Sequence, residues 1–585
     1  MGQPSTTEAT TPLATDRYIL AASAPPLGQE DLAELARPRR ERWEIVKHNV
    51  SRTVYRGFLG NMEVYLKHFH SRSWLHRLGR RISGGEARGE MKSLLYLRSR
   101  GMEVASPLAA GRTGTTEWLA TAAVCPAQRA DLWHQRQLAA GPAGYRRIRQ
   151  ATVALGRLIG RMHAAGVFHR DLHCGNILVR TDTPQPTLVL MDLHRLHRKR
   201  RLSRRSKAAN LAQLLHDRWD FTTRSDRLRF LRSYLSESGA GGSLRSWQEE
   251  VETFARRHRR RQYARRDRRT LGTGHYFSPI KLSYGWRGHV VLASKRRPVG
   301  SRSAEAEFTV EDWRLALRNP EALLTEGPLE VVKDSPSSRI VRRNLHVGPH
   351  HLEVFVKQAR RKKWWKALGD CLRPSRSIRA FELGHALLTR GVATTLPLAS
   401  LERRSGPWLR DSILITEAVD TPCLNRFMET HLAAPLRGSA PLTTVQRRQL
   451  AQEVLWQLGR LLQRLHDNNF AHRDLKSGNI LIHWQGASRP EVVLVDLDGL
   501  SRRRFLTARR RFQGLMRLNV SLLECRVVNH AGRLRMLLGY LRRPGGGRVN
   551  FKPYWRMLED WSARKLRQQI RSRRRRQKAA RRPAT

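Results

Sequence analysis

Apolar and polar positions follow the same pattern in two distant parts of the chain. A helical spacing of apolar residues that ends in histidine occurs in LGRLIGRMH (155–163) and again in LGRLLQRLH (458–466), as expected for a helix with one buried face. Farther along, TLVLMDLHRL (187–196) and EVVLVDLDGL (491–500) each begin as a short apolar run and reach an aspartate. These runs predict buried strands that end at a polar residue.

Strand-like alternation also surrounds one lysine in each part. The two segments are MEVYLKHF (62–69) and LEVFVKQA (352–359), and each is followed by a helical stretch that leads into RGMEVASPLA (100–109) or RGVATTLPLA (390–399). The same elements therefore occur twice in one order. A duplicated domain explains this better than coincidence.

The composition of the remaining segments sets the expected domain boundaries. We place the first domain at 41–250 and the second at 311–560. Residues 1–40, rich in Thr, Ala and Pro, are expected to be flexible. Residues 251–310 are expected to be a basic linker in which GHYFSPIKLSYGWRGHVVLAS can supply extra strands to the second domain, and residues 561–585 a basic tail.

A catalytic motif lies between the helical and the strand patterns of each copy. It reads HRDLHCGNIL at 169–178 and HRDLKSGNIL at 472–481. The pattern H-R-D-x-x-x-x-N with a later strand-end Asp is typical of the protein-kinase fold. We therefore predict an α+β fold with two tandem protein-kinase-like bilobal domains. Each would have a small antiparallel β N-lobe and a mainly helical C-lobe, and would use ATP and Mg²⁺.

Phosphoryl transfer assigns a role to each polar residue of the motif. A carboxylate must lie beside the acceptor hydroxyl, and we expect Asp171 and Asp474 to act as these bases. Each motif Asn opens a strand and each later Asp ends the next strand, so an antiparallel hairpin brings them side by side. Oxygen ligands of this kind bind Mg²⁺. The predicted metal ligands are Asn176, Asp192, Asn479 and Asp496.

The lysines of the alternating strands are the predicted nucleotide ligands. Lys67 is expected to pair with Glu90, or alternatively with Glu86, on the following helix, and Lys357 with Glu382. The two pairings place the glutamate at different positions along the helix, so the register of the second pairing stays open. Glu382 lies 9 residues before Gly391, whereas Glu90 lies 11 residues before Gly101.

Neither copy contains the glycine-rich phosphate loop G-x-G-x-x-G. The turns ahead of the lysine strands, KHNVSRTVYRG (47–57) and KDSPSSRIVRR (333–343), contain Ser, Asn and Arg instead. Backbone amides of such turns, with Ser51, Ser337 and Ser338, are predicted to bind phosphates; an ordinary hairpin is the alternative. His169 and His472 are expected to brace the catalytic loops.

The net charge indicates a polyanionic partner. The chain has 110 Lys and Arg against 49 Asp and Glu, a formal charge of +61. Its five cysteines are scattered and form no C-x-x-C pair, which indicates reduced thiols in the cytoplasm. The first residues do not resemble a signal peptide, and no run of 18 apolar residues occurs. We expect a cytoplasmic protein that can bind the inner face of the membrane peripherally.

Several segments together resemble the lipopolysaccharide core kinases, which phosphorylate heptose or 3-deoxy-D-manno-octulosonic acid (Kdo). The matching features are HRDLHCGNIL and MDLHRL in the first copy and SSRIV, GVATTLPLA, ITEAVD and HRDLKSGNIL in the second. The resemblance implies an ATP-dependent phosphotransferase acting on a sugar hydroxyl of an acidic glycolipid or phosphorylated sugar. The second copy departs from the pattern with Asp-Leu-Asp-Gly, and one chain holds two units where one is the common form.

Basic strips directly follow both metal aspartates. Residues 197–207 hold seven Lys or Arg in eleven, and residues 501–512 hold six in twelve. A helical pattern resumes at 207–215 and 512–523, which leaves little room for a peptide-docking loop. The strips suit an anionic sugar or an anionic bilayer, although solvated charge is the simpler explanation.

Other function classes remain open. A protein or small-molecule kinase with one inactive copy would use the same fold. A basic nucleic-acid-binding protein is the alternative from another class, because of the net charge. Against it, no aromatic-rich RNA-binding motif, finger spacing or repeat code occurs, and nucleic acid is the less expected partner.

Overall fold

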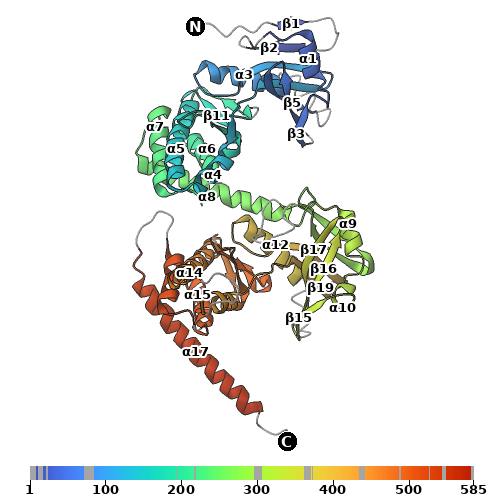
Figure 1. Ribbon diagram of the computed structural model, residues 1–585, viewed down its shortest axis with the longest axis vertical. Coiled ribbons are helices and arrows are strands. Elements are labelled where there is room, and N and C mark those ends of the chain that lie inside the picture. The colour runs from blue at the N-terminus through green and yellow to red at the C-terminus, as the bar shows by residue number, and fades with distance from the viewer. Residues whose placement is uncertain are drawn as a thin grey trace. The chain divides into compact units, whose positions relative to one another are not determined.

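The computed structural model divides the chain into two compact units, Met1–Arg260 and Arg261–Thr585 (Figure 1). It describes residues 8–10, 17–21, 24, 26–49, 51–70, 85–193, 196–216, 219, 221–294, 306–360, 371, 373–433, 442–486, 489–525, 527–542 and 549–580. Each unit has the protein-kinase-like arrangement of a small lobe built on an antiparallel sheet and a larger, mainly helical lobe.

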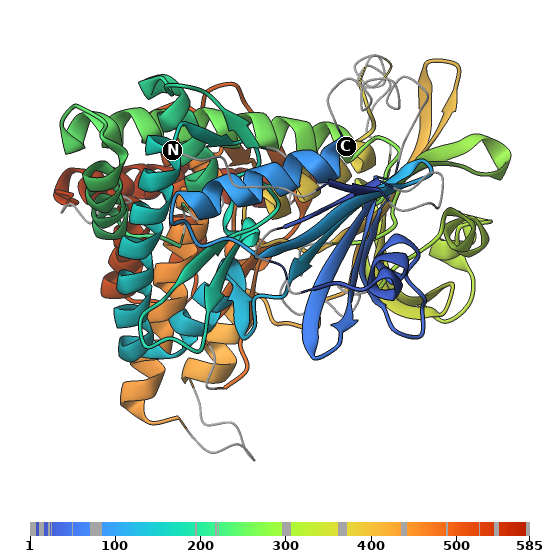
Figure 2. The same cartoon turned by 90° about the horizontal axis from the view of Figure 1, so that it is seen from above.

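The small lobe of the first unit is a seven-stranded antiparallel sheet with the order β1-β2-β6-β7-β5-β4-β3. Strands of this sheet are the blue arrows in Figure 2. Alternation along the lysine strand β5 turns Val64 and Leu66 into the core and Lys67 to the other face. The elements are β1 (Glu8–Thr10), β2 (Arg17–Leu20), α1 (Gln29–Ala36), β3 (Glu44–Asn49), β4 (Arg52–Leu59), β5 (Met62–Phe69), α3 (Glu86–Ser99), β6 (Pro107–Thr113) and β7 (Thr116–Ala122).

The large lobe of the first unit is organised around the helix pair α5 and α7. Gly156 allows the close approach, because a Cβ there would lie 2.6 Å from the Phe230 carbonyl oxygen. The elements are β8 (Ala127–Arg129), α4 (Ala130–Ala139), α5 (Gly141–Ala164), β9 (Val167–His169), η1 (Cys174–Asn176), β10 (Ile177–Arg180), β11 (Leu188–Leu190), β12 (Leu196–Arg198), α6 (Arg204–His216), α7 (Arg224–Ser238) and α8 (Leu244–Arg269).

The small lobe of the second unit repeats the topology of the first. Its sheet has the order β13-β14-β18-β19-β17-β16-β15, and every neighbouring pair is antiparallel. The elements are β13 (Phe277–Lys281), η3 (Ser283–Gly285), β14 (Trp286–Val291), α9 (Val310–Ala316), α10 (Ala322–Thr325), β15 (Glu330–Ser335), β16 (Ser338–Val347), β17 (His350–Ala359), α12 (Arg376–Thr389), β18 (Pro397–Ser405) and β19 (Trp408–Glu417).

The large lobe of the second unit packs α14 against α16, and Gly459 takes the place of Gly156 at their contact. A capping box starts α14, since Thr443 and Gln446 satisfy each other's backbone N–H groups. The elements are α13 (Leu424–Met428), η4 (Glu429–Ala433), α14 (Thr444–Asp467), β20 (Phe470–His472), η5 (Ser477–Asn479), β21 (Ile480–His483), β22 (Glu491–Leu494), η6 (Leu497–Gly499), β23 (Leu500–Arg502), α15 (Ala508–Leu523), α16 (His530–Leu541) and α17 (Lys552–Ala580).

The N-terminal segment departs from the expected flexibility. Strand β2 pairs with β6, and α1 buries Leu35 completely beside Trp43. A few apolar residues among many Thr, Ala and Pro are therefore enough to hold this segment on the sheet. Of the segment 1–40, residues 1–7, 11–16, 22, 23 and 25 lie outside the described residues.

The basic runs are also helical where we expected a linker and a tail. Trp247, Val251 and Ala255 recur every four residues and give α8 a buried stripe, and the arginines that follow favour the helix. The tail continues α17 as far as Ala580. Strands β13 and β14 form the edge of the second sheet, whereas residues 295–305 of the expected linker lie outside the described residues. No helix in the described parts of the chain is long and apolar enough to cross a membrane.

Candidate active sites

A hairpin in each unit brings the predicted metal ligands to one end of two paired strands. Met191 N–H donates to the Asn176 carbonyl oxygen at 2.9 Å, and Val495 N–H donates to that of Asn479 at 2.9 Å. Asp192 and Asp496, the next residues, both adopt left-handed backbone conformations, with φ of 59° and 61°. Asp tolerates this conformation better than most residues, and such strain is concentrated at functional sites.

The catalytic loops are braced by the histidines of their H-R-D motifs. His169 Nδ1 accepts from the Asp171 N–H at 3.1 Å, and its Nε2 lies 3.3 Å from the Met191 carbonyl oxygen. Burial lowers the pKa of His169, which keeps the ring neutral. The Asp171 carboxylate itself is 43% exposed, which leaves it accessible to an acceptor.

The side chains of the motif asparagines are hydrogen-bonded to the backbone of their catalytic loops. Asn176 Nδ2 donates to the Asp171 carbonyl oxygen at 2.9 Å, and Asn479 Nδ2 donates to that of Asp474 at 2.8 Å. Their amide oxygens are thereby left for another partner. One Asp and one Asn per unit fit Mg²⁺, which binds few protein ligands and keeps water and phosphate as the rest. Within the described residues, no cluster of three or more His, Cys, Asp or Glu could hold a metal.

The first unit joins its lysine, helix and metal loop through one glutamate. Lys67 Nζ lies 2.6 Å from Glu90 Oε1 and 3.5 Å from Asp192 Oδ1. The same Glu90 oxygen accepts from the Leu193 N–H at 3.1 Å, and the side chain is buried. The pairing expected for Lys67 is therefore present, and Glu90 ties α3 to the loop that contains Asp192.

Arg52 is a site residue that sequence reasoning missed. Its guanidinium donates to both Asp192 carboxylate oxygens, at 2.6 and 2.9 Å, and this hydrogen bonding raises the pKa of Arg52. Arg52 follows Ser51 in the predicted phosphate turn, and Ser51 fixes that turn by accepting from the His70 N–H at 2.8 Å. The only available signal was an arginine within the turn.

The pairing of Lys357 with Glu382 was wrong. Lys357 Nζ lies 2.6 Å from Asp496 Oδ1 and 2.8 Å from Asp498 Oδ2. Burial lowers the pKa of Lys357, but the Asp498 and Asp496 carboxylates outweigh it and hold the pKa above its usual value. The missed partner, Asp498, belongs to the Asp-Leu-Asp-Gly sequence that departs from the first copy.

Helix register explains this error. Both helices end two residues before a glycine with positive φ, Gly101 or Gly391. Counting back from these glycines places the buried Ala380, not Glu382, at the position of Glu90. Glu382 is influenced instead by Asp267 and Arg502. Burial and the Asp267 carboxylate raise the pKa of Glu382, and Arg502 opposes them.

A cleft of about 1210 Å³ in the second unit brings the predicted residues together. Ser337 and Ser338 of the phosphate turn line it, and Ser335 Oγ supports that turn by accepting from the Ser338 N–H at 3.3 Å. Lys476 Nζ lies 2.8 Å from Asp474 Oδ2. The lining includes the predicted residues Lys357, Asp474, Asn479 and Asp496 and seven arginines, Arg373, Arg376, Arg379, Arg473, Arg503, Arg510 and Arg517.

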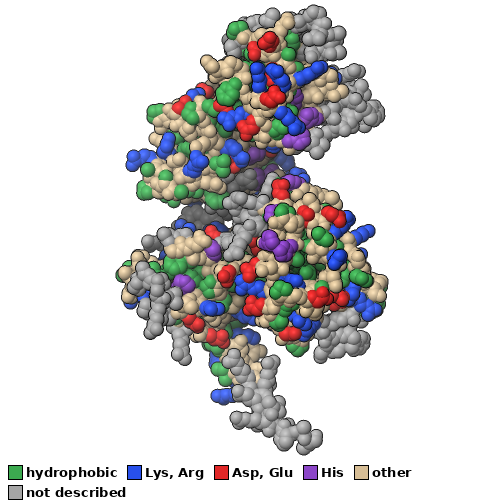
Figure 3. Space-filling view, turned by 45° about the vertical axis from the view of Figure 1, so that its right-hand side comes forward, with side chains coloured by type: hydrophobic (Ala, Val, Ile, Leu, Met, Phe, Trp, Pro, Cys, Tyr) green, Lys and Arg blue, Asp and Glu red, His purple; other side chains and the backbone are tan. Residues whose placement is uncertain are grey.

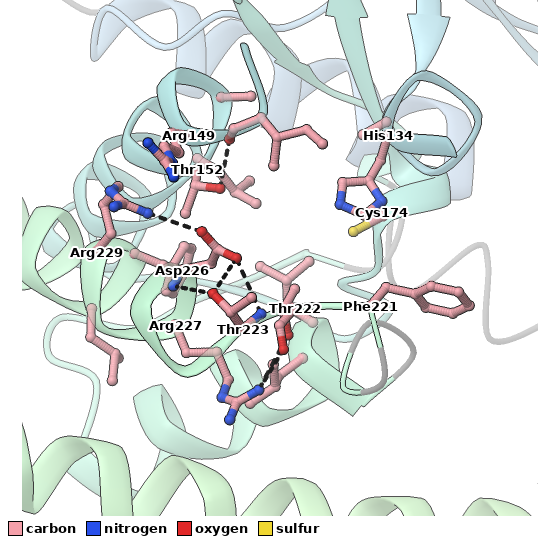
Figure 4. A pocket seen from close by; sticks show the side chains of 18 of the residues that line it. His134, Arg149, Thr152, Cys174, Phe221, Thr222, Thr223, Asp226, Arg227 and Arg229 are labelled. Carbon is pink, nitrogen blue, oxygen red and sulfur yellow. Dashed lines mark hydrogen bonds and ion pairs between the residues drawn. The ribbon is translucent and has the colours of Figure 1, made fainter. Parts of the chain in front are cut away.

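A separate cavity of about 420 Å³ lies in the large lobe of the first unit (Figure 4). Cys174 and Ile177 line it from the catalytic loop and β10, and the other walls come mainly from α4, α5, α7 and α8. Asp226 is satisfied within the wall, by Thr223 at 2.6 Å and Arg229 at 2.9 Å. Most of the remaining lining is apolar, and none of the predicted catalytic or metal-binding residues of the first unit is among the residues that line the cavity.

Comparison with protein families gives a match in each unit. The lipopolysaccharide kinase (Kdo/WaaP) family matches residues 29–234 and 337–540, which together make up more than half of the chain. The chain belongs to this family. The resemblance noted from the two catalytic motifs is thereby confirmed, and the repeat of the family match agrees with the repeat of the sheet topology.

Individual relatives in the kinase family match shorter stretches. The Pseudomonas aeruginosa lipopolysaccharide core heptose(I) kinase WaaP is 31% identical over 159 residues, which are 25% of this chain and 59% of that protein. A Xylella fastidiosa 3-deoxy-D-manno-octulosonic acid kinase is 29% identical over 125 residues, 21% of this chain and 41% of that protein. The chain thus spans about half the length of these curated relatives.

Two solved structures also resemble part of the chain. WaaP in complex with acyl carrier protein has 25% sequence identity and a TM-score of 0.31, and the match covers 38% of this chain and 88% of that one. An aminoglycoside-3'-phosphotransferase of type VIII has 17% identity and a TM-score of 0.26, over 36% of this chain and 93% of that one.

Proposed function

We propose that the chain is a tandem ATP-dependent phosphotransferase that phosphorylates a sugar hydroxyl, of heptose or Kdo, on an acidic glycolipid. The main support is a grouping of four residues that occurs in each unit. It consists of a strand lysine, the aspartate of the H-R-D motif, the motif asparagine and a later aspartate whose backbone is in the left-handed conformation. Membership of a family of sugar kinases favours this acceptor over a peptide.

Each residue of the grouping has a distinct task in the proposed reaction. Asp171 and Asp474 accept the proton of the acceptor hydroxyl. Asn176 with Asp192, and Asn479 with Asp496, would hold Mg²⁺, which neutralises phosphate charge when bound. Lys67 and Lys357 orient the nucleotide phosphates, helped by the turns at Ser51 and at Ser337 and Ser338.

The arginines of the second cleft support an anionic acceptor. Seven arginines line the same cleft as Asp474 and Asp496, and arginine binds phosphate and carboxylate groups through paired hydrogen bonds. A sugar that already has such groups would neutralise this charge. The overall charge of +61 also favours peripheral binding to the anionic inner face of the cytoplasmic membrane.

The test is phosphate transfer from labelled ATP to isolated lipopolysaccharide core oligosaccharide by the full chain. Asp171→Asn and Asp474→Asn should each reduce transfer at their own site by about 10²- to 10⁴-fold if the carboxylate is the base. A matched control is Asp182→Asn, which breaks an exposed pair with Arg180 at the end of the first hairpin and should leave transfer unchanged.

Two results would contradict the proposal. The double variant could transfer phosphate at the native rate, which would exclude these bases. The native chain could instead fail to use any core oligosaccharide and bind nucleic acid with a steep salt dependence. Loss of all transfer in Asp171→Asn alone would indicate that the second copy is inactive.

A further inference from the structure

Two arginines recur at corresponding places in both units. Arg100 and Arg390 follow the last turns of α3 and α12, the helices that pack beside the lysine strands. Arg198 and Arg502 end β12 and β23, the strands that follow the metal aspartates, and pair with Val167 and Phe470 in the same register. Each unit therefore brings a helix-end arginine toward a strand-end arginine.

In the first unit both arginines lie over one aromatic ring. Arg198 lies 4.6 Å and Arg100 lies 5.5 Å from the ring centre of Tyr96. The Tyr96 hydroxyl donates to the Ala165 carbonyl oxygen at 3.0 Å, which fixes the ring. Cations stack favourably on such a ring, so no carboxylate is needed between these arginines.

The second unit has alanine at this position and uses a carboxylate instead. Ala386 corresponds to Tyr96 when the two helices are aligned on the glycines that follow them. Asp267, on the last turns of α8, binds both Arg390 nitrogens at 2.8 and 2.7 Å and Arg502 at 2.5 Å. The Asp267 and Arg390 side chains are only 7% and 2% exposed.

Helix α8 contributes a second residue to this cluster. Tyr263 lies one turn before Asp267, and the Arg390 guanidinium lies 4.5 Å from its ring centre. Phe470, which starts β20 just ahead of the catalytic loop, is 5.4 Å from the same guanidinium. The cluster thus contacts α12, β20, which precedes Asp474 in the chain, and β23, which follows Asp496.

The second unit also lacks the connection that Glu90 makes in the first. There, Glu90 ties α3 to the metal loop through the Leu193 N–H, whereas the corresponding Ala380 has no polar side chain. A buried, bidentate Asp–Arg pair fixes the relative orientation of the elements that supply it. We infer that Asp267 is a positioning residue of the second site. Its carboxylate joins the end of α12 to β23, the strand that follows Asp496.

This inference rests on the proposed function only in assuming that the second cleft binds Mg·ATP. The experiment measures Mg·ATP binding calorimetrically in the full chain with Lys67→Ala, so that binding reports on the second cleft. Asp267→Asn should weaken binding by about 2- to 30-fold, the range expected for a coupling residue. Asp267→Glu should restore most of the affinity, because it keeps a carboxylate for both arginines.

A second variant guards against simple loss of folding. Arg502→Met removes only the partly exposed arginine and leaves the buried Asp267–Arg390 pair intact. It should weaken Mg·ATP binding while the thermal unfolding temperature stays near that of the parent. The matched control is Glu250→Gln, which breaks an exposed ion pair of the same helix with Arg204 and should change neither quantity.

Each remaining outcome has a definite meaning. Unchanged Mg·ATP affinity in both Asp267→Asn and Arg502→Met overturns the inference. The inference is also overturned if Asp267→Asn binds Mg·ATP more weakly only because less of the protein is folded, while Arg502→Met binds as tightly as the parent. A parent chain with no Mg·ATP binding at the second cleft overturns the inference and the proposed function together. A parent that binds Mg·ATP but phosphorylates no acceptor contradicts the proposed function alone.

Discussion

Each unit places a carboxylate against its strand lysine, but the carboxylates come from different elements. Glu90 comes from helix α3, and Asp498 from η6, which directly follows Asp496. A largely buried ammonium needs a nearby carboxylate, because an unpaired buried charge is costly. In the second unit, Ala380 of α12 stands at the position of Glu90, and Asp498 supplies the carboxylate instead. This pairing explains why the second copy has Asp-Leu-Asp-Gly at the place where it departs from the first copy.

Removing either carboxylate should impair its own site alone. Glu90→Gln should slow transfer at the first site, and Asp498→Asn at the second, by about 10- to 100-fold, because the lysine loses the partner that orients it. Steady-state transfer by each variant, in backgrounds with Asp474→Asn or Asp171→Asn, separates the two sites. Glu382→Gln is the control for the second unit. An equal effect of Glu382→Gln and Asp498→Asn would contradict the assignment.

The residues found from the sequence are those with a fixed place in a local pattern. Asn176 and Asp192 were found because one hairpin joins them, and Glu90 because it lies on the helix that follows the lysine strand. Glu382 was chosen for its charge, although the count back from Gly391 favoured Ala380. Arg52 and Asp498 contact partners about 140 positions away, and no local periodicity indicates contacts of that range.

At the scale of elements, the basic strips coincide with the connections between a strand and a helix. Residues 197–207 run from β12 into α6, and residues 501–512 run from β23 into α15. Lys and Arg side chains are spread over the visible faces of both units rather than gathered in one patch (Figure 3). The strips are therefore distinguished by their place in the chain shortly after Asp192 and Asp496, and not by charge alone.

Reversing charge in the first strip should affect the acceptor more than the nucleotide. Replacing the exposed Arg200, Arg201 and Arg205 with Glu should raise the acceptor KM about tenfold or more, with the KM for ATP little changed. The effect is local because charges are screened beyond about 8 to 10 Å at physiological salt. Arg198 is left intact because it stacks on Tyr96.

The matched control lies far along the chain on α17. Replacing Arg567, Arg571 and Arg574 with Glu changes the charge by the same amount and should leave the KM of a soluble oligosaccharide unchanged. The two KM values are measured in the Asp474→Asn background so that they describe the first site. Equal effects of the two triple variants would show that the strip belongs to a general basic surface.

Across the whole molecule, each unit buries a histidine–tyrosine pair between two packed helices of its large lobe, α5 and α7 in the first unit and α14 and α16 in the second. His163 Nδ1 lies 2.9 Å from the Tyr234 hydroxyl, and His466 Nδ1 lies 3.0 Å from that of Tyr540. Burial lowers the pKa of His163 to about 4 and that of His466 to about 3. Both rings are therefore neutral in the folded protein.

These pKa values predict that acid destabilises both units. The unfolded chain takes up a proton below about pH 6.5 and the folded chain does not, so stability is full above that pH and falls as the pH decreases toward the folded pKa. Each histidine should account for about 2 kcal/mol of lost stability between pH 7.5 and 5. Urea unfolding at the two pH values measures this loss.

Variants assign the loss to the buried rings. His163→Gln should reduce the acid sensitivity of the first unit, in which His169 also has a lowered pKa, and retain that of the second. The exposed His275, replaced with Gln, serves as the control. An unfolding free energy that falls equally in native and His163→Gln chains would show that carboxylates, not His163, dominate the acid response.

Helix α8 also restricts how the chain can be rearranged. It begins as the last helix of the first unit and supplies Tyr263 and Asp267 to the second. If a gene encoded the two copies in reverse order, the present second copy would no longer follow helix α8. Arg390 and Arg502 would then lack the Asp267 carboxylate that binds both of them. The duplicated copies are therefore no longer interchangeable modules, and their order along the chain has become part of the second copy's structure.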